Sequence, residues 1–182
     1  PCTDNQLREV EIPIGKTQLS GLIGQPRNPK RTGLRGVVLV HGFAAEKTEN
    51  GFFEFIAETL LKEGHTVLLY DWRGLGDSKG DFAETDLELH TSDFQEVATW
   101  FAKYTGISPQ NTCALGFSLG ATLVALSVNK GGMFGGLALL SPALRPAAGA
   151  ARYWPMFQRS AASRSFPIRL LHPKESLARH SG

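Results

Sequence analysis

The chain has 182 residues, of which 42% are hydrophobic and 20% are charged, and its formal net charge is +2. That length suits one domain with a buried core, and the weak charge gives no reason to propose a nucleic-acid partner or an acidic membrane surface. No apolar run approaches the ~18 residues of a membrane span, and residues 1–20 lack the order of a signal peptide. We therefore expect a soluble, cytoplasmic protein without a membrane span.

Short apolar runs predict the strands. The first two runs alternate imperfectly around a Gly-Lys turn, which is typical of a β-hairpin. Several later runs are continuous and rich in Val or Leu, as in strands that are buried on both faces. The predicted strands are residues 7–14, 17–23, 36–40, 66–70, 112–115 and 135–140.

Three helices are predicted between the later strands. Residues 50–63 carry apolar side chains on one side and end at a glycine, Gly64. Thr85 and Glu88 form a capping-box pattern that opens a second helix, and a third helix ends near residue 129. This alternation indicates an α/β fold: a mostly parallel sheet with helices on both faces, behind an N-terminal β-hairpin.

The most informative motif is Gly116-Phe117-Ser118-Leu119-Gly120, which lies between a predicted strand and a predicted helix. That context is required of a nucleophile elbow. The turn is so sharp that only small residues fit beside the serine, and its strained backbone holds the serine oxygen clear of the sheet. Ser118 is therefore the candidate nucleophile. The alternative is a glycine-flanked serine at an ordinary strand-to-helix turn.

A second motif, His41-Gly42-Phe43, directly follows the third predicted strand. Acyl transfer passes through an oxyanion that needs two aimed N–H donors. Leu119, the residue after the nucleophile, would supply one donor, and the backbone of Phe43 or Ala44 would supply the other. In this role His41 shapes the loop and is not the catalytic base.

The segment 71–78, Asp-Trp-Arg-Gly-Leu-Gly-Asp-Ser, follows the fourth predicted strand. Its glycines beside charged residues raise the question of phosphate binding. The dinucleotide pattern, however, requires a glycine where Lys79 stands, and no Gly-Lys-Ser/Thr tail is present. We expect no cofactor here, and instead a tight loop held by Asp71, Arg73 and Ser78, with Asp77 at the rim.

In order and spacing, these three motifs resemble those of the α/β-hydrolase superfamily. Within it the chain is most similar to small bacterial carboxylesterases of the cinnamoyl and feruloyl esterase kind, and to their serine-aminopeptidase and monoacylglycerol-lipase relatives. The resemblance implies that Ser118 attacks an ester carbonyl and forms an acyl-enzyme. It also implies a histidine base oriented by an Asp or Glu, in the chain order Ser, acid, His.

The end of the chain departs from that pattern. After Ser118 the only carboxylate is Glu175 and the only histidines are His172 and His180. Glu175 is therefore the candidate acid and His180 the candidate base, although the family places a helix and a strand between these roles. We expect an α/β-hydrolase core with incomplete late strands in residues 1–143, a short cap or lid segment in 144–165, and a seventh strand with a basic tail in 166–182.

Two interpretations of this tail stay open. The chain is either a truncated or altered product of a longer esterase, which the missing strand favours, or it is complete and uses Glu175 and His180 or a partner's histidine. A non-catalytic ligand-binding or partner-binding module and an acyl transferase are the alternative functions. The unpaired sheet edge would invite self-association. His65 and His90 are expected at the start of a strand and on a helix surface.

Overall fold

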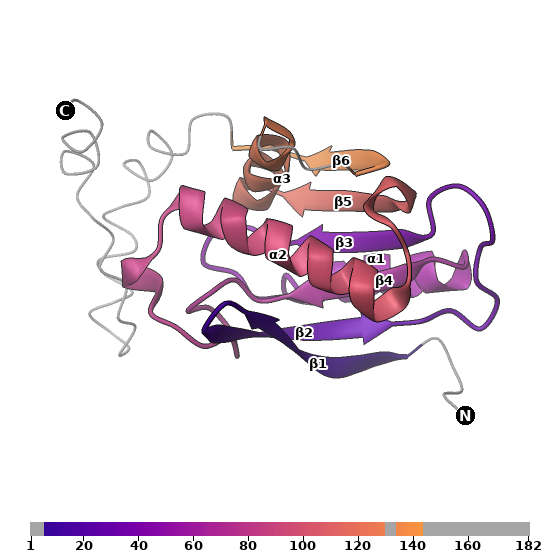
Figure 1. The fold of residues 1–182 in the computed structure, drawn as a ribbon, viewed down its shortest axis with the longest axis horizontal. Coiled ribbons are helices and arrows are strands. Elements are labelled where there is room, and N and C mark those ends of the chain that lie inside the picture. The colour runs from indigo at the N-terminus through magenta and orange to yellow at the C-terminus, as the bar shows by residue number, and fades with distance from the viewer. Residues whose placement is uncertain (1–5, 130–133, 144–182) are drawn as a thin grey trace.

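A computed structural model describes residues 6–129 and 134–143 of the chain. These residues form a six-stranded sheet with helices on both faces (Figure 1). Two short 3-10 helices, η1 (Phe82–Glu84) and η2 (Pro109–Asn111), precede α2 and β5. The other elements are β1 (Leu7–Ile14), β2 (Thr17–Gly24), β3 (Gly36–Val40), α1 (Phe52–Lys62), β4 (Thr66–Tyr70), α2 (Leu87–Thr105), β5 (Thr112–Phe117), α3 (Leu119–Asn129) and β6 (Gly136–Leu140).

The sheet is mixed and mostly parallel, in the order β1-β2-β4-β3-β5-β6. The β1–β2 hairpin is antiparallel and joins β4 in an antiparallel pair, whereas β4, β3, β5 and β6 run parallel to one another. The predicted fold class is therefore confirmed, with the hairpin in front and an open sheet. Because β3, β4 and β5 are parallel, their carboxyl ends meet at one end of the sheet, where the motifs follow them.

Each face of the sheet has its own apolar core. Alternate residues of β3 show this division, since Val37 and Leu39 pack toward α1 while Val38 and Val40 pack toward α2 and α3. All five residues of β3 are buried, as are those of β4, which explains why both strands are continuous apolar runs. The side chains that the three helices contribute are Phe53, Ala57 and Leu61 from α1, Phe94, Val97 and Phe101 from α2, and Leu123 and Val124 from α3.

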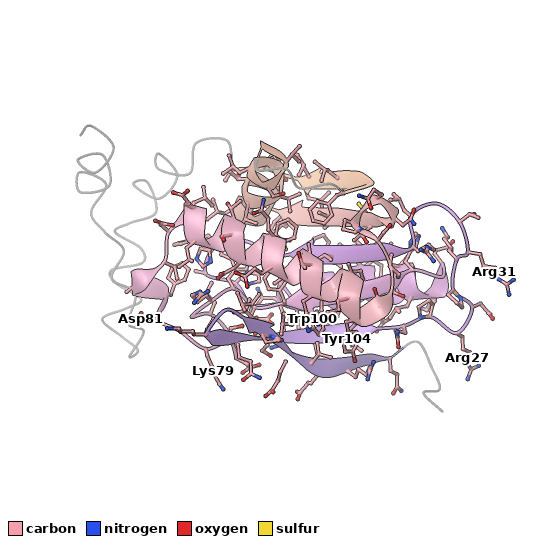
Figure 2. All side chains as sticks on the ribbon, viewed as in Figure 1. Arg27, Arg31, Lys79, Asp81, Trp100 and Tyr104 are labelled. Carbon is pink, nitrogen blue, oxygen red and sulfur yellow. The ribbon has the colours of Figure 1, made fainter. Side chains whose placement is uncertain are left out.

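The helix α2 packs across one face of the sheet and reaches the β1–β2 hairpin. Figure 2 labels Trp100 and Tyr104 on this helix. The Trp100 and Tyr104 rings stack with their centroids 4.7 Å apart. Arg8 of β1 donates to the Tyr104 hydroxyl at 2.9 Å and lies over the Tyr104 ring. The hairpin is thereby joined to the helical layer as well as to the sheet.

Two element boundaries differ from the prediction by two residues. α1 begins at Phe52, two residues later than expected, because Glu49, Asn50 and Gly51 all have a positive φ that a helix cannot contain. β5 runs to Phe117, two residues further than expected, because its partner β6 pairs with it as far as Leu140. The extension carries the strand to the residue that precedes Ser118.

The predicted capping box at Thr85 is wrong. Thr85 closes η1, with its hydroxyl donating to Phe82 O at 2.7 Å, and the next residue caps α2. The Asp86 side chain accepts the Leu89 N–H at 2.8 Å. α2 is the longest helix described, at 19 residues, yet within residues 6–129 and 134–143 no helix combines the length and the apolar character that crossing a membrane requires.

Candidate active site

Ser118 occupies the turn between β5 and α3 in a left-handed conformation, with φ at 53°. A non-glycine residue adopts this region at a cost, which is tolerated where the surrounding structure fixes the backbone. Here the Ser118 N–H donates to Leu140 O at 2.9 Å, and Ser118 O accepts the Ala143 N–H at 3.1 Å. The end of β6 and the segment that follows it therefore hold both sides of the strained residue.

The two flanking glycines are required by space. A Cβ on Gly116 would lie 2.5–2.6 Å from Gly120 and Ala121, the residues that begin the next helix. A Cβ on Gly120 would overlap the carbonyl oxygens of Val40 and His41. The turn is thus as tight as the Gly-x-Ser-x-Gly motif predicts, and α3 begins directly against the end of β3.

The loop after β3 lies beside the serine. A Cβ built on Gly42 would lie 3.4 Å from Ser118 Cβ and 3.6 Å from the Phe117 ring. Phe43 follows Gly42 directly, and Leu119 is the first residue of α3, where backbone N–H groups have no acceptor within the helix. The structure therefore brings the segments that carry Ser118, Leu119 and Phe43 to one place.

His41 is buried, and both of its ring nitrogens have partners. Nδ1 lies 2.8 Å from Gly42 O, and Nε2 accepts the Trp72 N–H at 3.1 Å, which makes Nδ1 the protonated nitrogen. The ring also stacks on Trp72, with centroids 5.0 Å apart, and burial lowers its pKa. These contacts join the loops after β3 and β4, so His41 shapes the site, as the sequence indicates.

The loop after β4 is organised by the carboxylate of Asp71, which is completely buried. It accepts the backbone N–H of Lys47 at 2.6 Å and that of Asp77 at 2.9 Å, and its own carbonyl accepts the Ser78 hydroxyl at 2.7 Å. A Cβ on Gly76 would overlap this carboxylate, so glycine is required there. The interpretation of this segment as a tight loop held by Asp71 and Ser78 is confirmed.

Arg73 completes that loop by pairing with α2. Its guanidinium donates to both carboxylate oxygens of Asp93, at 2.8 and 2.7 Å. Asp93 is buried, and a bidentate pair of this kind is the geometry that arginine supports best. The pair raises the pKa of Arg73 and fixes the loop to the helical layer.

The role of Lys47 was not predicted from the sequence. Its ammonium lies 2.7 Å from Asp71 Oδ2 and 2.7 Å from Asp77 Oδ2, so it joins the buried carboxylate to the exposed one at the rim. Burial opposes the lysine charge, but the hydrogen bonds to both carboxylates outweigh it and raise the pKa of Lys47. A single lysine within a polar loop has no pattern that would have revealed this contact.

The expectation for His90 is wrong, because the side chain is buried between α2 and the loop after β4. Its ring lies 4.8 Å from Trp72 and 5.7 Å from Phe82, centroid to centroid. Among the residues described, neither His90 Nε2 nor Trp72 Nε1 has a hydrogen-bond partner. Burial lowers the pKa of His90 to about 4. His65, by contrast, precedes β4 directly, as expected.

The candidate acid and base, Glu175 and His180, lie outside the described residues, as do His172 and the cap and tail segments predicted for 144–182. Within residues 6–129 and 134–143 the histidines are His41, His65 and His90. No hydrogen bond joins any of these three to Ser118 in that part of the chain. The described part of the site thus holds Ser118, the candidate nucleophile, and the loops around it.

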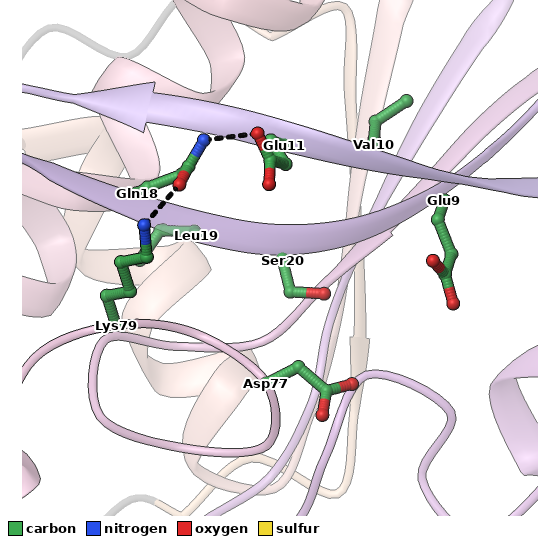
Figure 3. A pocket seen from close by; sticks show the side chains of 8 residues that line it. All are labelled: Glu9, Val10, Glu11, Gln18, Leu19, Ser20, Asp77 and Lys79. Atoms are coloured by element: carbon green, nitrogen blue, oxygen red, sulfur yellow. Dashed lines mark hydrogen bonds between the residues drawn. The ribbon is translucent and has the colours of Figure 1, made fainter.

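Among the described residues, two hollows lie away from Ser118. One, of about 280 Å³, faces the outer side of the hairpin, where Lys79 donates to Gln18 at 2.8 Å and Gln18 donates to Glu11 (Figure 3). The other, of about 460 Å³, is lined by Arg27, Lys30 and Arg35 among others. Figure 2 shows Arg27 at the end of the sheet opposite to Lys79 and Asp81.

The model of the family described as serine aminopeptidase, S33, matches residues 34–180. A thiohydrolase, aneE, from Aspergillus aculeatus is 34% identical over 90 residues, which are 48% of this chain and 28% of that protein.

Among solved structures, the esterase Pf2001 of Pyrococcus furiosus is similar with a TM-score of 0.69 at 22% identity, over 85% of this chain and 56% of that one. The α/β-hydrolase GrgF of Penicillium sp. sh18 is similar with a TM-score of 0.68 at 19% identity, over 88% and 54%. The chain therefore spans little more than half the length of these structures, and their likeness establishes an α/β-hydrolase fold.

Proposed function

This chain belongs to the serine aminopeptidase S33 family, and we propose that it is a serine hydrolase that cleaves carboxylic esters through an acyl-enzyme on Ser118. The observation that carries this proposal is the left-handed backbone of Ser118 between two glycines that no other residue can replace without overlap. An ordinary strand-to-helix turn does not require this strain. The strain supports a serine that is placed for attack.

In this mechanism the Ser118 oxygen attacks the ester carbonyl while a base removes its proton. The carbonyl oxygen becomes an oxyanion, which the N–H groups of Leu119 and Phe43 would bind, with the N-terminus of α3 adding its positive dipole. The alcohol leaves with a proton, and water then hydrolyses the acyl-enzyme. We retain His180 as the proposed base and Glu175 as the proposed acid that orients it.

The side chains next to the elbow favour a substrate with an apolar or aryl group. Phe117 and Phe52 meet edge to face, with centroids 5.9 Å apart, and Phe52 is 43% exposed. Phe55, one turn further along α1, is 70% exposed. Aromatic faces of this kind bind aryl and acyl groups well. They support carboxylesterase activity of the feruloyl-esterase kind, whereas the similarity to the esterase Pf2001 and to the thiohydrolase aneE leaves other hydrolase substrates as candidates.

Turnover of a short-chain nitrophenyl ester tests the proposal. We expect Ser118→Ala to lower kcat/KM on the order of 10⁴-fold or more, because removal of a nucleophile leaves only binding and the oxyanion hole. Ser92→Ala, which changes an exposed serine on α2, is the matched control and should leave turnover unchanged. Equal turnover by the Ser118→Ala variant and the unchanged chain would exclude the proposed nucleophile.

The alternative is a non-catalytic module that self-associates, and β6, the last strand of the sheet within the described residues, supports it. Leu137 and Leu139 of β6 are 42% and 41% exposed, and Leu126 and Val128 of α3 are exposed beside them. An unpaired apolar edge is a site at which a second chain can add. Light scattering during the turnover measurement separates the two functions, since a monomer that hydrolyses the ester contradicts the alternative.

A further inference from the structure

Glu49 lies at the end of the loop that runs from β3 to α1, and its side chain returns to the beginning of that loop. Its Oε2 accepts the Gly42 N–H at 2.7 Å. The backbone of Glu49 is left-handed, with φ at 50°, and its N–H donates to Glu46 O at 2.9 Å. Such a costly conformation persists only where surrounding contacts fix the residue. Here these contacts direct the side chain at a single amide.

Gly42 lies beside both this carboxylate and Ser118. A Cβ on Gly42 would lie 3.4 Å from Ser118 Cβ and 3.5 Å from Glu49 Oε1. Ser118 Cβ and Glu49 Oε1 are therefore no more than about 7 Å apart, and both lie beside Gly42. Glu49 thus contacts the His41–Gly42 peptide group, one peptide group before the one that carries the Phe43 N–H proposed to bind the oxyanion.

The surroundings of Glu49 are only partly polar. Burial raises its pKa, the Gly42 N–H lowers it, and the neighbouring charge of Glu46 raises it again. Glu46 itself is engaged with the backbone N–H groups of Thr48 and Asn50, so it does not replace Glu49 at Gly42. Lys47, the nearest cation along the loop, is committed to Asp71 and Asp77.

We propose that Glu49 is a positioning residue for the oxyanion hole: by accepting the Gly42 N–H, its carboxyl group fixes the Gly42–Phe43 backbone beside Ser118. This inference rests on the proposed acyl-transfer function of Ser118. The physical reason is that an oxyanion donor works only when it is preorganised, and misplacement by about 1 Å can cost on the order of a hundredfold in rate. Glu49 acts through the loop and does not touch the substrate.

Three substitutions of Glu49 separate the effect of its side-chain length from the effect of its negative charge. Glu49→Gln keeps the length and an acceptor oxygen but removes the negative charge. Glu49→Asp keeps the charge but is one methylene too short to reach Gly42. Glu49→Ala removes both, and if it does not fold, the Gln and Asp variants still decide between the two properties.

The first measurement is the rate constant for phosphonylation of Ser118 by a fluorophosphonate, separated from the affinity for the probe. We expect Glu49→Asp and Glu49→Ala to lower the rate constant about 10- to 100-fold with little change in affinity, and Glu49→Gln to stay within about threefold of the unchanged chain. A Gln variant as slow as the Asp variant, or an Asp variant as fast as the unchanged chain, would overturn the proposal.

The second measurement needs no catalysis. In amide NMR spectra of the full chain, the Gly42 N–H resonance should shift with pH as Glu49 titrates, should stop titrating in Glu49→Gln, and should move upfield in Glu49→Asp. A Gly42 resonance that is indifferent to all three variants would overturn the proposal. If Ser118 proves unreactive while Gly42 follows Glu49, the contact stands and the proposed function fails, so the two failures are distinguishable.

Discussion

At the scale of single residues, the site depends on positions where only glycine fits because a Cβ would overlap neighbouring atoms. Gly120 lies against the carbonyl oxygens that end β3, while Gly42 has ordinary van der Waals room for a Cβ. Both glycines lie close to Ser118, but an added Cβ would overlap other atoms only at Gly120. The turn therefore requires Gly120, whereas Gly42 leaves space beside Ser118.

This contrast gives a stability prediction. Gly120→Ala should lower the free energy of unfolding by about 3 kcal/mol or more, because the new Cβ overlaps backbone atoms that cannot move independently. Gly42→Ala is the matched control and should cost less than about 1 kcal/mol. Urea unfolding followed by circular dichroism measures both values. A Gly120→Ala variant as stable as the unchanged chain would mean that the turn is looser than described.

At the scale of elements, α2 contributes the residues that hold the loop after β4. Asp93 pairs with Arg73, and His90 packs on Trp72 and Phe82. These contacts lie one turn apart on the buried side of the helix. α2 therefore holds the loop after β4 in place, although it carries no residue that is proposed to react.

The burial of His90 predicts a pH dependence of stability. Its pKa is lowered from 6.5 to about 4, so the unfolded chain binds a proton at this residue more readily than the folded chain does. Stability should then be complete above pH 6.5 and should fall as the pH falls toward about 4, by up to roughly 3 kcal/mol.

Urea unfolding at several pH values, with His90→Phe as the comparison, measures this contribution. The phenylalanine variant should lose less stability than the unchanged chain between pH 6.5 and 4, since it has no proton to bind. Parallel curves for the two proteins would contradict the assignment of a buried neutral histidine.

At the scale of the whole molecule, sequence periodicity predicts most of the fold. The strand runs, the alternation of strand and helix, and the Gly-x-Ser-x-Gly turn are local patterns, and each is found where expected. The cap of α2 at Asp86, the buried Lys47 and the inward side of His90 were not predicted. Lys47 and His90 depend on contacts between segments that are distant in the sequence, which periodicity does not encode. The Asp86 cap is a local contact, and it lies one residue beyond the predicted Thr85 because Thr85 closes η1.

The candidate site divides in the same way. The glycines around Ser118 form a recognisable motif because a single turn fixes their spacing. The sequence alone was therefore sufficient to predict the tight turn. Glu49 has no motif, because its partner Gly42 is set by the path of the loop between them. A signal was nevertheless present in the Glu49-Asn50-Gly51 segment, where polar residues before a glycine are typical of left-handed turns.

The most direct test of the central claim is to locate the covalent adduct of a fluorophosphonate probe by mass spectrometry. Digestion with trypsin should place the adduct on the peptide of residues 104–130, and fragmentation should assign it to Ser118, not to Ser108 or Ser127. The account predicts one adduct per chain at Ser118 and none in the Ser118→Ala variant. An adduct on another residue, or one that survives Ser118→Ala, would contradict it.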